Sequence, residues 1–391
     1  MADTLIVTNF AYGTGPYLRT TELALAVNRE FEARGKPRMK ILVPWVYGQR
    51  QKQVLLEEFG DHVRTHLDEI ILDVKLGAIL KSVFYTGHQK YEETLKRWIE
   101  TEEAASQSAH EYLGGSIEAE TLNGKKITVS GKDIVLEVNR SPRIRYRVAP
   151  SYSTTFGYVA DILERASALP KGVVEVPPEL LKEGVLLADS VEGEQTLHFM
   201  AYPATFSWSA DYQDRYGATI VPPITDLPKD GGESIHAEGI FVTITGIEGL
   251  ERLYQEARDL GLTLYSNDTE AVQGSIKALP SILSSPRIKL QFARAGWGSL
   301  WLSMFRGTPI LVPRYDPTDD PEIYFNNIAL KNLGFGLVYE GQPLKDILAK
   351  SEECRTRASL VQQDIKSRWG TLNGNDICAK MIVNHFSGVP V

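Results

Sequence analysis

Short apolar runs alternate with longer amphipathic segments along the first part of the chain. The run TLIVTNF at 4–10 is typical of a buried strand, and a glycine-containing turn follows it. In the segment 21–35 apolar residues recur at helical spacing from Leu23 to Phe31, until a glycine ends the pattern. The run MKILVPW at 39–45 predicts the next strand. This order of strand, turn, helix and strand predicts a parallel α/β sheet.

After these elements the hydrophobic pattern becomes helical and then alternating. Residues 62–113 are predicted to be mostly helical. They carry one apolar stripe with lysines on its flanks: Leu72, Leu76, Ile79 and Val83. Such a stripe can lie on a membrane surface or face an ordinary core, and we favour the core. Residues 117–148 alternate and contain turn pairs such as Asn123-Gly124, so they predict β-hairpins in an insertion.

A second α/β unit begins near residue 230. The segment 221–234 is rich in proline and glycine, as is typical of a linker between domains. Beyond it the patterning predicts further strands with helices between them, at 239–246, 262–267, 288–293 and 309–314. Two α/β domains are therefore expected, with a ligand cleft between them.

Composition narrows the class of protein. The chain has 391 residues, which favours two domains, and its 43% hydrophobic and 24% charged residues are ordinary for a globular protein. The net charge of −8 argues against general attraction to nucleic acid. Cys354 and Cys378 have no metal-binding or disulfide spacing. We find neither a secretion signal nor a run of about 18 apolar residues, so a soluble, cytoplasmic protein without a transmembrane segment is expected.

A glycine-bearing turn follows three of the predicted strands and precedes a helix. The turns are Gly13-Thr14-Gly15, Gly246-Ile247-Glu248-Gly249 and Gly296-Trp297-Gly298-Ser299. Free N–H groups and the helix dipole suit a phosphate at such places, and Arg294 stands just before the third turn. The alternative is that each turn merely connects a strand to a helix, since short glycine motifs are weak signals.

The third turn is followed by further markers in a fixed order. Residues 296–336 resemble the donor-binding domain of GT-B glycosyltransferases, of the branch that includes the peptidoglycan N-acetylglucosaminyltransferase and the plant and macrolide glycosyltransferases. Three sets of residues match the family pattern of a glycine turn, a Gly-x-Pro and a later asparagine: Gly296, Gly298 and Ser299; Gly307 and Pro309; and Asn326. Glu322 lies where the family has a sugar-contacting residue.

The resemblance implies a fold and a division of the chain. The fold class is α/β, with two Rossmann-like domains that face each other across a cleft and a hairpin-rich insertion in the first. Residues 1–228 would bind the acceptor, with the hairpin segment at about 117–148, and the C-terminal helix 375–391 would pack back on this domain. Residues 229–374 would bind the donor.

The resemblance also implies a function. A sugar would move from a nucleotide-diphosphate sugar, UDP-linked, to a small-molecule or lipid-linked acceptor, without a catalytic metal or a cofactor. The donor-binding residues implied are Gly13, Thr14, Gly15, Gly246, Arg294, Gly296, Trp297, Gly298, Ser299, Glu322 and Asn326.

The chain departs from the family at three places. Arg294 replaces the histidine before the glycine turn, and Leu302 stands where a glutamate usually holds the ribose. No histidine occurs before His62, although inverting members often carry a catalytic histidine in the first loop. The catalytic residue is therefore left unassigned. A non-hydrolysing nucleotide-sugar epimerase and a non-catalytic nucleotide-sugar-binding subunit remain as alternatives.

The acidic residues at 316–322 and two tryptophans each allow a functional and a structural interpretation. The carboxylates Asp316, Asp319, Asp320 and Glu322 could hold a cation, but a solvated acidic loop is favoured. Trp297 and Trp301 could stack on a base or a sugar, but their i, i+4 spacing favours packing on one helix face.

Overall fold

The computed structural model describes residues 4–84, 90–228, 235–243 and 250–389. The chain divides into two compact units. The first comprises Met1–Ala201, Gln213–Thr225 and Asn373–Val391, and the second comprises Tyr202–Tyr212 and Asp226–Leu372. A single boundary at residue 228 would leave Tyr202–Tyr212 in the first domain, whereas these residues pack in the second unit.

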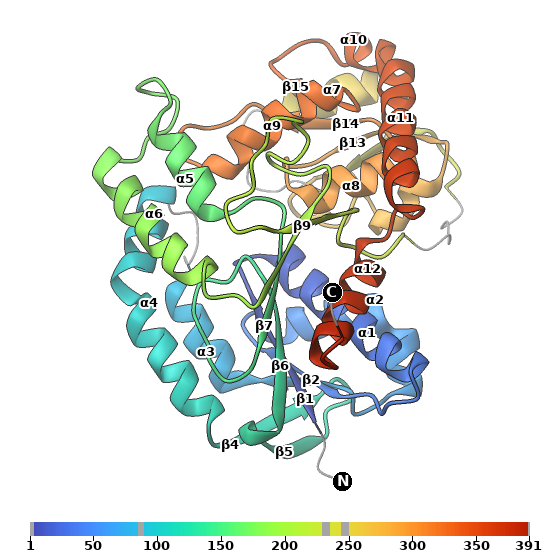
Figure 1. Cartoon of the computed structure of the whole chain (residues 1–391). Coiled ribbons are helices and arrows are strands. Elements are labelled where there is room, and N and C mark those ends of the chain that lie inside the picture. Colours follow the sequence, from blue (N-terminus) through green and yellow to red (C-terminus); the bar gives the residue numbers. More distant parts are fainter. Residues whose placement is uncertain (1–3, 85–89, 229–234, 244–249, 390–391) are drawn as a thin grey trace. The chain divides into compact units, whose positions relative to one another are not determined.

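A nine-stranded sheet forms the centre of the first unit (Figure 1). Its order is β5-β4-β3-β2-β1-β6-β7-β8-β9, and the pairs from β3 to β9 are parallel. The parallel strands are β1 (Leu5–Phe10), β2 (Lys40–Pro44), β3 (Ile70–Asp73), β6 (Ile134–Arg140), β7 (Ser151–Thr155), β8 (Leu197–Ala201) and β9 (Thr219–Val221). Every residue of β1 is buried, including the polar Thr8 and Asn9.

The predicted hairpin region is only partly a hairpin. β4 (Ser116–Thr121) and β5 (Lys126–Ser130) form an antiparallel hairpin at the sheet edge. By contrast, β6 pairs in parallel with β1 in the middle of the sheet, and residues 143–148 form no strand. The hairpin prediction rested on the alternating runs at 126–131 and 143–148, and only the first of them contains a strand of a hairpin, β5.

Helices cover the first sheet and account for the apolar stripe. They are α1 (Thr14–Ala33), α2 (Gly48–Thr65), α3 (Val74–Val83), α4 (Tyr91–Leu113), α5 (Val159–Ser167), α6 (Pro178–Glu192) and α12 (Gly374–Phe386), with a 3-10 turn at Gly131–Asp133. Leu72 lies in strand β3 rather than in a helix. It is buried together with Leu76 and Val83, so the core interpretation of the stripe is confirmed.

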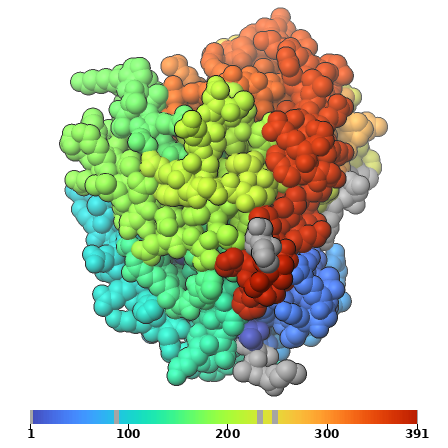
Figure 2. Space-filling view, viewed as in Figure 1, coloured from blue at the N-terminus to red at the C-terminus, as the bar shows by residue number. Residues whose placement is uncertain are grey.

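The C-terminal helix α12 packs against α1 in the first unit (Figure 1). The ring of Phe386 meets the edge of Phe31 at 5.5 Å between centroids, and Lys36 donates to the Ser387 hydroxyl at 3.3 Å. Figure 2 shows this segment in red beside the first α/β segment in blue. The two ends of the sequence thus build one unit.

The second unit contains a six-stranded parallel sheet of order β12-β11-β10-β13-β14-β15. Its strands are β10 (Gly239–Val242), β11 (Thr263–Ser266), β12 (Ile276–Lys277), β13 (Ile288–Phe292), β14 (Ile310–Pro313) and β15 (Gly336–Tyr339). Its helices are α7 (Glu251–Asp259), α8 (Trp297–Arg306), α9 (Pro321–Leu333), α10 (Leu344–Ala349) and α11 (Ser351–Trp369), with a 3-10 turn at Pro280–Ser284.

Apolar side chains form a core on one face of the β10/β13 pair. Ile240, Val242, Leu290 and Phe292 are buried together with Leu253 of α7. Both units are therefore Rossmann-like, as the strand–helix alternation predicted. Within the described residues, no helix is both long enough and apolar enough to span a bilayer.

Candidate functional site

The turn after β13 stands where the strand order of the second sheet reverses. The sheet grows outward in both directions from the β10/β13 pair. In open parallel sheets, ligands bind outside the carboxyl ends of the strands at such a reversal. Residues 293–296 leave β13 at this edge and lead directly into α8. The predicted glycine turn therefore occupies the position where a ligand is expected.

The protein itself does not require glycine at Gly296 or Gly298. Gly296 has an ordinary φ of −86° and precedes α8, while Gly298 lies in the first turn of that helix. Among the described residues, no neighbouring heavy atom lies within 4 Å of a Cβ built at either position. The two usual structural reasons for glycine, a positive φ and a close neighbour, are thus missing. The glycines leave space for a group from outside the chain.

Arg294 supplies a positive charge beside this turn. Its side chain is 48% exposed, and its Nη2 pairs with Oδ1 of Asp319 in the loop after β14. The same carboxylate oxygen accepts the N–H of Asp320 at 2.7 Å. Solvent screens an ion pair of this exposure, so its net contribution is about 0–1 kcal/mol. Another anion can therefore exchange with Asp319 at modest cost, and phosphate suits a guanidinium well.

Asn326 of α9 is fully buried, and both ends of its side-chain amide are hydrogen-bonded. Its Oδ1 accepts from Nε1 of Trp297 and from the hydroxyl of Thr205, each at 2.8 Å. Its Nδ2 donates to the carbonyl of Ala295 at 2.8 Å and to Oε1 of Glu322 at 2.9 Å. Two acceptor and two donor positions exhaust the capacity of the amide.

Direct donor contact by Trp297 and Asn326 does not fit this arrangement. Trp297 is 1% exposed, and its N–H already donates to Asn326 and Thr205. Trp301 is equally buried and donates to the carbonyl of Pro203 at 2.8 Å, so packing on one helix face is confirmed for both indoles. These side chains instead tie the glycine turn to α9 and to the segment Tyr202–Tyr212.

The acidic loop is held by its own local hydrogen bonds. Asp316 accepts from the N–H and the hydroxyl of Thr318 at 2.8 and 2.9 Å. Asp320 caps α9 by accepting the N–H of Glu322 at 2.9 Å. Since Asp319 pairs with Arg294, each aspartate has a structural partner, which supports the solvated-loop interpretation over a metal site. Glu322 is half-buried in the first turn of α9.

The turn after β1 stands at the corresponding reversal of the first sheet, between β1 and β6. Gly13 has φ +115°, a conformation that strongly favours glycine. Its N–H donates to the hydroxyl of Tyr47, which follows β2, at 2.7 Å. Thr14 and Gly15 open α1 and are exposed. The amide of Gly13 therefore already has a partner within the protein.

Aromatic rings surround this first turn. Tyr12 packs edge-on against Tyr47 and Phe84, with centroids 5.8 and 5.7 Å apart, and Tyr17 contacts Tyr47 at 5.6 Å. Burial raises the pKa of the Tyr17 hydroxyl, although a hydrogen bond with Thr14 opposes the shift. Tyr12 is 44% exposed, whereas Phe84 is buried. The carboxyl edge of the first sheet thus presents an exposed aromatic face.

Comparison by sequence with family models and with curated proteins gives no match. Comparison by structure gives matches over nearly the whole chain. TcCGT1 in complex with UDP matches with a TM-score of 0.65 at 11% identity, covering 99% of this chain and 100% of that one. UGT2 of Phytolacca americana, complexed with UDP-2fluoro-glucose and pterostilbene, matches at 0.59 and 10% identity, with 99% of both chains covered.

A bacterial structure agrees with these plant-type matches. The glycosyltransferase SsfS6 of Streptomyces sp. SF2575, complexed with thymidine diphosphate, has a TM-score of 0.52 at 14% identity and covers 98% of this chain and 99% of that one. The chain has the GT-B fold. The predicted fold class is therefore confirmed.

The predicted donor-binding residues of the second unit differ in how far their side chains or backbone are exposed to solvent. Arg294 and Gly298 are exposed, and Gly296 and Ser299 are half-buried, so these four remain candidates for direct contact. Gly246 lies outside the described residues. Sequence reasoning missed the role of Thr205, because its partner Asn326 is 121 positions away and no local pattern marks the pair.

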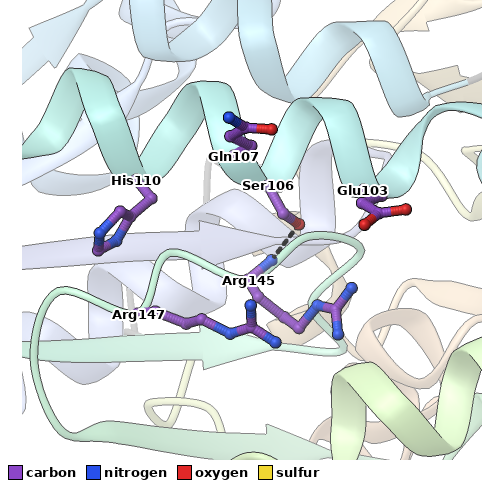
Figure 3. A pocket seen from close by; sticks show the side chains of 6 residues that line it. All are labelled: Glu103, Ser106, Gln107, His110, Arg145 and Arg147. Atoms are coloured by element: carbon purple, nitrogen blue, oxygen red, sulfur yellow. Dashed lines mark hydrogen bonds between the residues drawn. The ribbon is translucent and has the colours of Figure 1, made fainter.

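A cavity of about 440 Å³ lies in the first unit, and none of its lining residues belongs to either glycine turn (Figure 3). It is lined by Glu103, Ser106, Gln107 and His110 of α4 and by Arg145 and Arg147. Arg145 pairs with Glu102, and Arg147 with Glu194. These residues belong to the first unit, whereas the turn after β13 belongs to the second, so we do not assign this cavity to the donor.

Proposed function

We propose that this chain is a glycosyltransferase that takes its sugar from a nucleotide-diphosphate sugar, with a uridine nucleotide as the first candidate. One observation carries the proposal: in a GT-B fold, an open glycine turn with an exposed arginine stands at the strand reversal of the second sheet. The solved structures with UDP and thymidine diphosphate support a nucleotide diphosphate as the ligand class.

The chemistry at this turn would be stabilisation of a leaving group. When the anomeric carbon is attacked, negative charge develops on the departing diphosphate. The first N–H groups and dipole of α8 favour that charge, and Arg294 would exchange its bond to Asp319 for one to a phosphate oxygen. All three contributions come from this chain's own groups. Gly296 and Gly298 would let the phosphate approach the backbone closely.

Glu322 remains the proposed sugar contact of the second unit. It lies in the first turn of α9 and accepts a hydrogen bond from the buried Asn326. That bond fixes the carboxylate while leaving it acceptor capacity for a sugar hydroxyl. Asn326 would thus act through Glu322 and Trp297, as a positioning residue rather than as a sugar contact.

We further propose that the first unit binds the acceptor at the aromatic face around Tyr12. Tyr12 is exposed and is supported by Tyr47 and Phe84, so an acceptor with an apolar or aromatic group could pack on its ring. Gly13, Thr14 and Gly15 are kept as proposed donor contacts through the exposed start of α1 rather than through the amide of Gly13.

Calorimetry with UDP, thymidine diphosphate and their sugar conjugates tests the donor site. Arg287 offers a matched control, because it is exposed and precedes β13 at the opposite edge of the sheet from Arg294. We expect UDP binding that Arg294→Ala weakens and Arg287→Ala leaves unchanged. Equal effects of the two substitutions, or no nucleotide binding at all, would contradict the proposed site.

A binding protein without catalysis is the second candidate. It is favoured by Leu302 and Arg294, which replace the glutamate and histidine of the family pattern. The two candidates differ in one measurement: release of UDP from the sugar nucleotide, followed over time with and without a panel of phenolic acceptors. Binding without any release of UDP would favour the non-catalytic role.

A further inference from the structure

A second group of ligand-type side chains lies in the first unit, at the end of α2. His62 and His66 are spaced i, i+4 in the last turn of this helix and its C-cap, and Glu69 directly precedes β3. One ligand atom from each lies within 4.8 Å of the other two. We propose that His62, His66 and Glu69 bind a divalent transition metal ion, with Zn²⁺ as the best match to two imidazoles and a carboxylate.

The hydrogen bonds of His66 set the tautomer that a metal needs. The hydroxyl of Thr65 donates its one hydrogen to the carbonyl of His62 at 2.9 Å. The same oxygen lies 2.9 Å from Nδ1 of His66, so while the hydroxyl donates to the carbonyl, Nδ1 carries the hydrogen of this contact. In the neutral ring the lone pair is then on Nε2.

Glu69 is held in place before any metal arrives. Arg38 donates to both carboxylate oxygens, at 2.9 and 2.8 Å, and Asn28 donates to one of them at 2.6 Å. The carboxylate is therefore a preorganised ligand with supporting partners, the arrangement expected around a metal-binding glutamate.

The charged groups around the site carry a net negative charge, which favours a cation. Arg38 is shared between Glu69 and Glu32, whose carboxylate lies 2.8 Å from its Nη1. With neutral imidazoles, two carboxylates and one guanidinium give the cluster a net charge of −1. A divalent ion would bind between Nε2 of His62 and Oε2 of Glu69, which are now 3.0 Å apart, and the hydrogen of the neutral ring would then be on Nδ1.

The simpler account is an ion pair between His62 and Glu69 at a helix end. That account assigns no role to His66, whose ring stacks on His62 at 4.4 Å with 7° between the planes. Parallel rings do not aim their lone pairs at one point, so the half-buried His66 must turn its ring, and exchange its present contact with Thr65, to complete the site. Water would then fill the fourth position of a tetrahedral ion.

Calorimetric titration of the untagged, full-length protein with ZnCl₂ tests the proposal. We expect one Zn²⁺ per chain at neutral pH and weaker binding at acidic pH, because the imidazoles must be free of protons. His66→Ala and Glu69→Gln should each weaken binding about tenfold or more. His110→Ala removes an exposed histidine of α4 and should change nothing. Circular dichroism checks that every variant remains folded.

Each outcome decides between the accounts. No saturable binding by the wild-type protein overturns the proposal. Loss of binding in His66→Ala together with unchanged binding in Glu69→Gln would identify a two-histidine surface site and would also overturn it. Zn²⁺ affinity that falls in both variants supports the three-ligand site. None of these readouts depends on nucleotide binding, so the result stands whether or not the proposed donor site is correct.

Discussion

The turns after β1 and after β13 occupy the same position in two Rossmann-like sheets, but their first glycines, Gly13 and Gly296, differ in what the fold requires of them. Gly13 has φ +115°, and its amide donates to Tyr47, so the protein's own backbone explains the residue. Gly296 and Gly298 have ordinary backbone angles and open space where a Cβ would be. A glycine that the fold requires says little about ligands. A glycine that the fold does not require leaves space for one, and Gly15 of the first turn shares that property with Gly296 and Gly298.

The strands beneath the two turns differ as well. The β10/β13 pair sets Ile240 opposite Leu290 and Val242 opposite Phe292, all apolar and buried. In the first unit, β6 sets the buried Glu137 opposite Val7 of β1. The central strand pair of the first unit therefore buries an acid, whereas β13 buries the neutral Gln291.

Substitution of Asn326 should have the largest effect on the second turn. Asn326→Leu removes the acceptor of the Thr205 hydroxyl, the donor to the Ala295 carbonyl and one of the two acceptors of the Trp297 N–H. We expect a loss of about 3–5 kcal/mol in the free energy of unfolding, since each unpaired buried group costs roughly 1–3 kcal/mol. Urea unfolding measures it. Asn332→Leu, on the outer part of the same helix, should cost much less.

Exchange of glycine for valine should separate the two turns most clearly. Gly298→Val should reduce UDP affinity on the order of a hundredfold, about 2.7 kcal/mol, with little change in melting temperature, because valine is tolerated in a helix and fills open space. Gly13→Val should instead destabilise the protein by about 1–3 kcal/mol, because φ +115° is strained for a branched residue. Unfolding of Gly298→Val would remove the distinction between the turns.

Loss of the guanidinium at the second turn should have an intermediate effect. Arg294→Ala should weaken UDP binding by about 1.5–3 kcal/mol, the usual cost of a charge-assisted hydrogen bond. Asp319→Asn should strengthen binding slightly, since it removes the carboxylate that competes for Arg294. Calorimetry compares both with wild type. Weaker binding in Asp319→Asn would mean that Asp319 positions Arg294 rather than competes with phosphate.

The smallest effect concerns the buried acid of the first unit. Burial raises the pKa of Glu137 to about 7, while hydrogen bonds from Asn9 and Asn139 oppose the shift. The folded state therefore favours the protonated acid. Its contribution to stability is complete below the unfolded pKa of about 4.3 and is lost as the pH rises through 7.

Glu137→Gln mimics the neutral acid and should remove this dependence. We expect the variant to be more stable than wild type by about 1–2 kcal/mol at pH 8, and the two to converge near pH 4. Thermal unfolding across this range measures the difference. A parallel pH dependence in both proteins would assign the titration to another group, such as Glu192, whose pKa burial also raises to about 7.

The sequence by itself determined the alternation of strands and helices. It also placed the open turn at 296–298 and the charge at Arg294, because hydrophobic period and glycine position are local properties. It misjudged β6 by including it in a region of hairpins, although β6 is a central parallel strand in which Glu137 and Asn139 are buried. Only the fold could reveal this, because alternation records polarity and not exposure.

The tertiary structure alone decided which residues surround the turns. Thr205 reaches Asn326 across 121 positions, Asp319 reaches Arg294 across 25, and Tyr47 reaches the amide of Gly13 across 34. Each contact joins segments far apart in the sequence, and no periodic pattern encodes it. Parallel strands bring the loops at their carboxyl ends together whatever those loops contain. The partners of a side chain at that edge therefore depend on strand order, which residue-by-residue patterns do not specify.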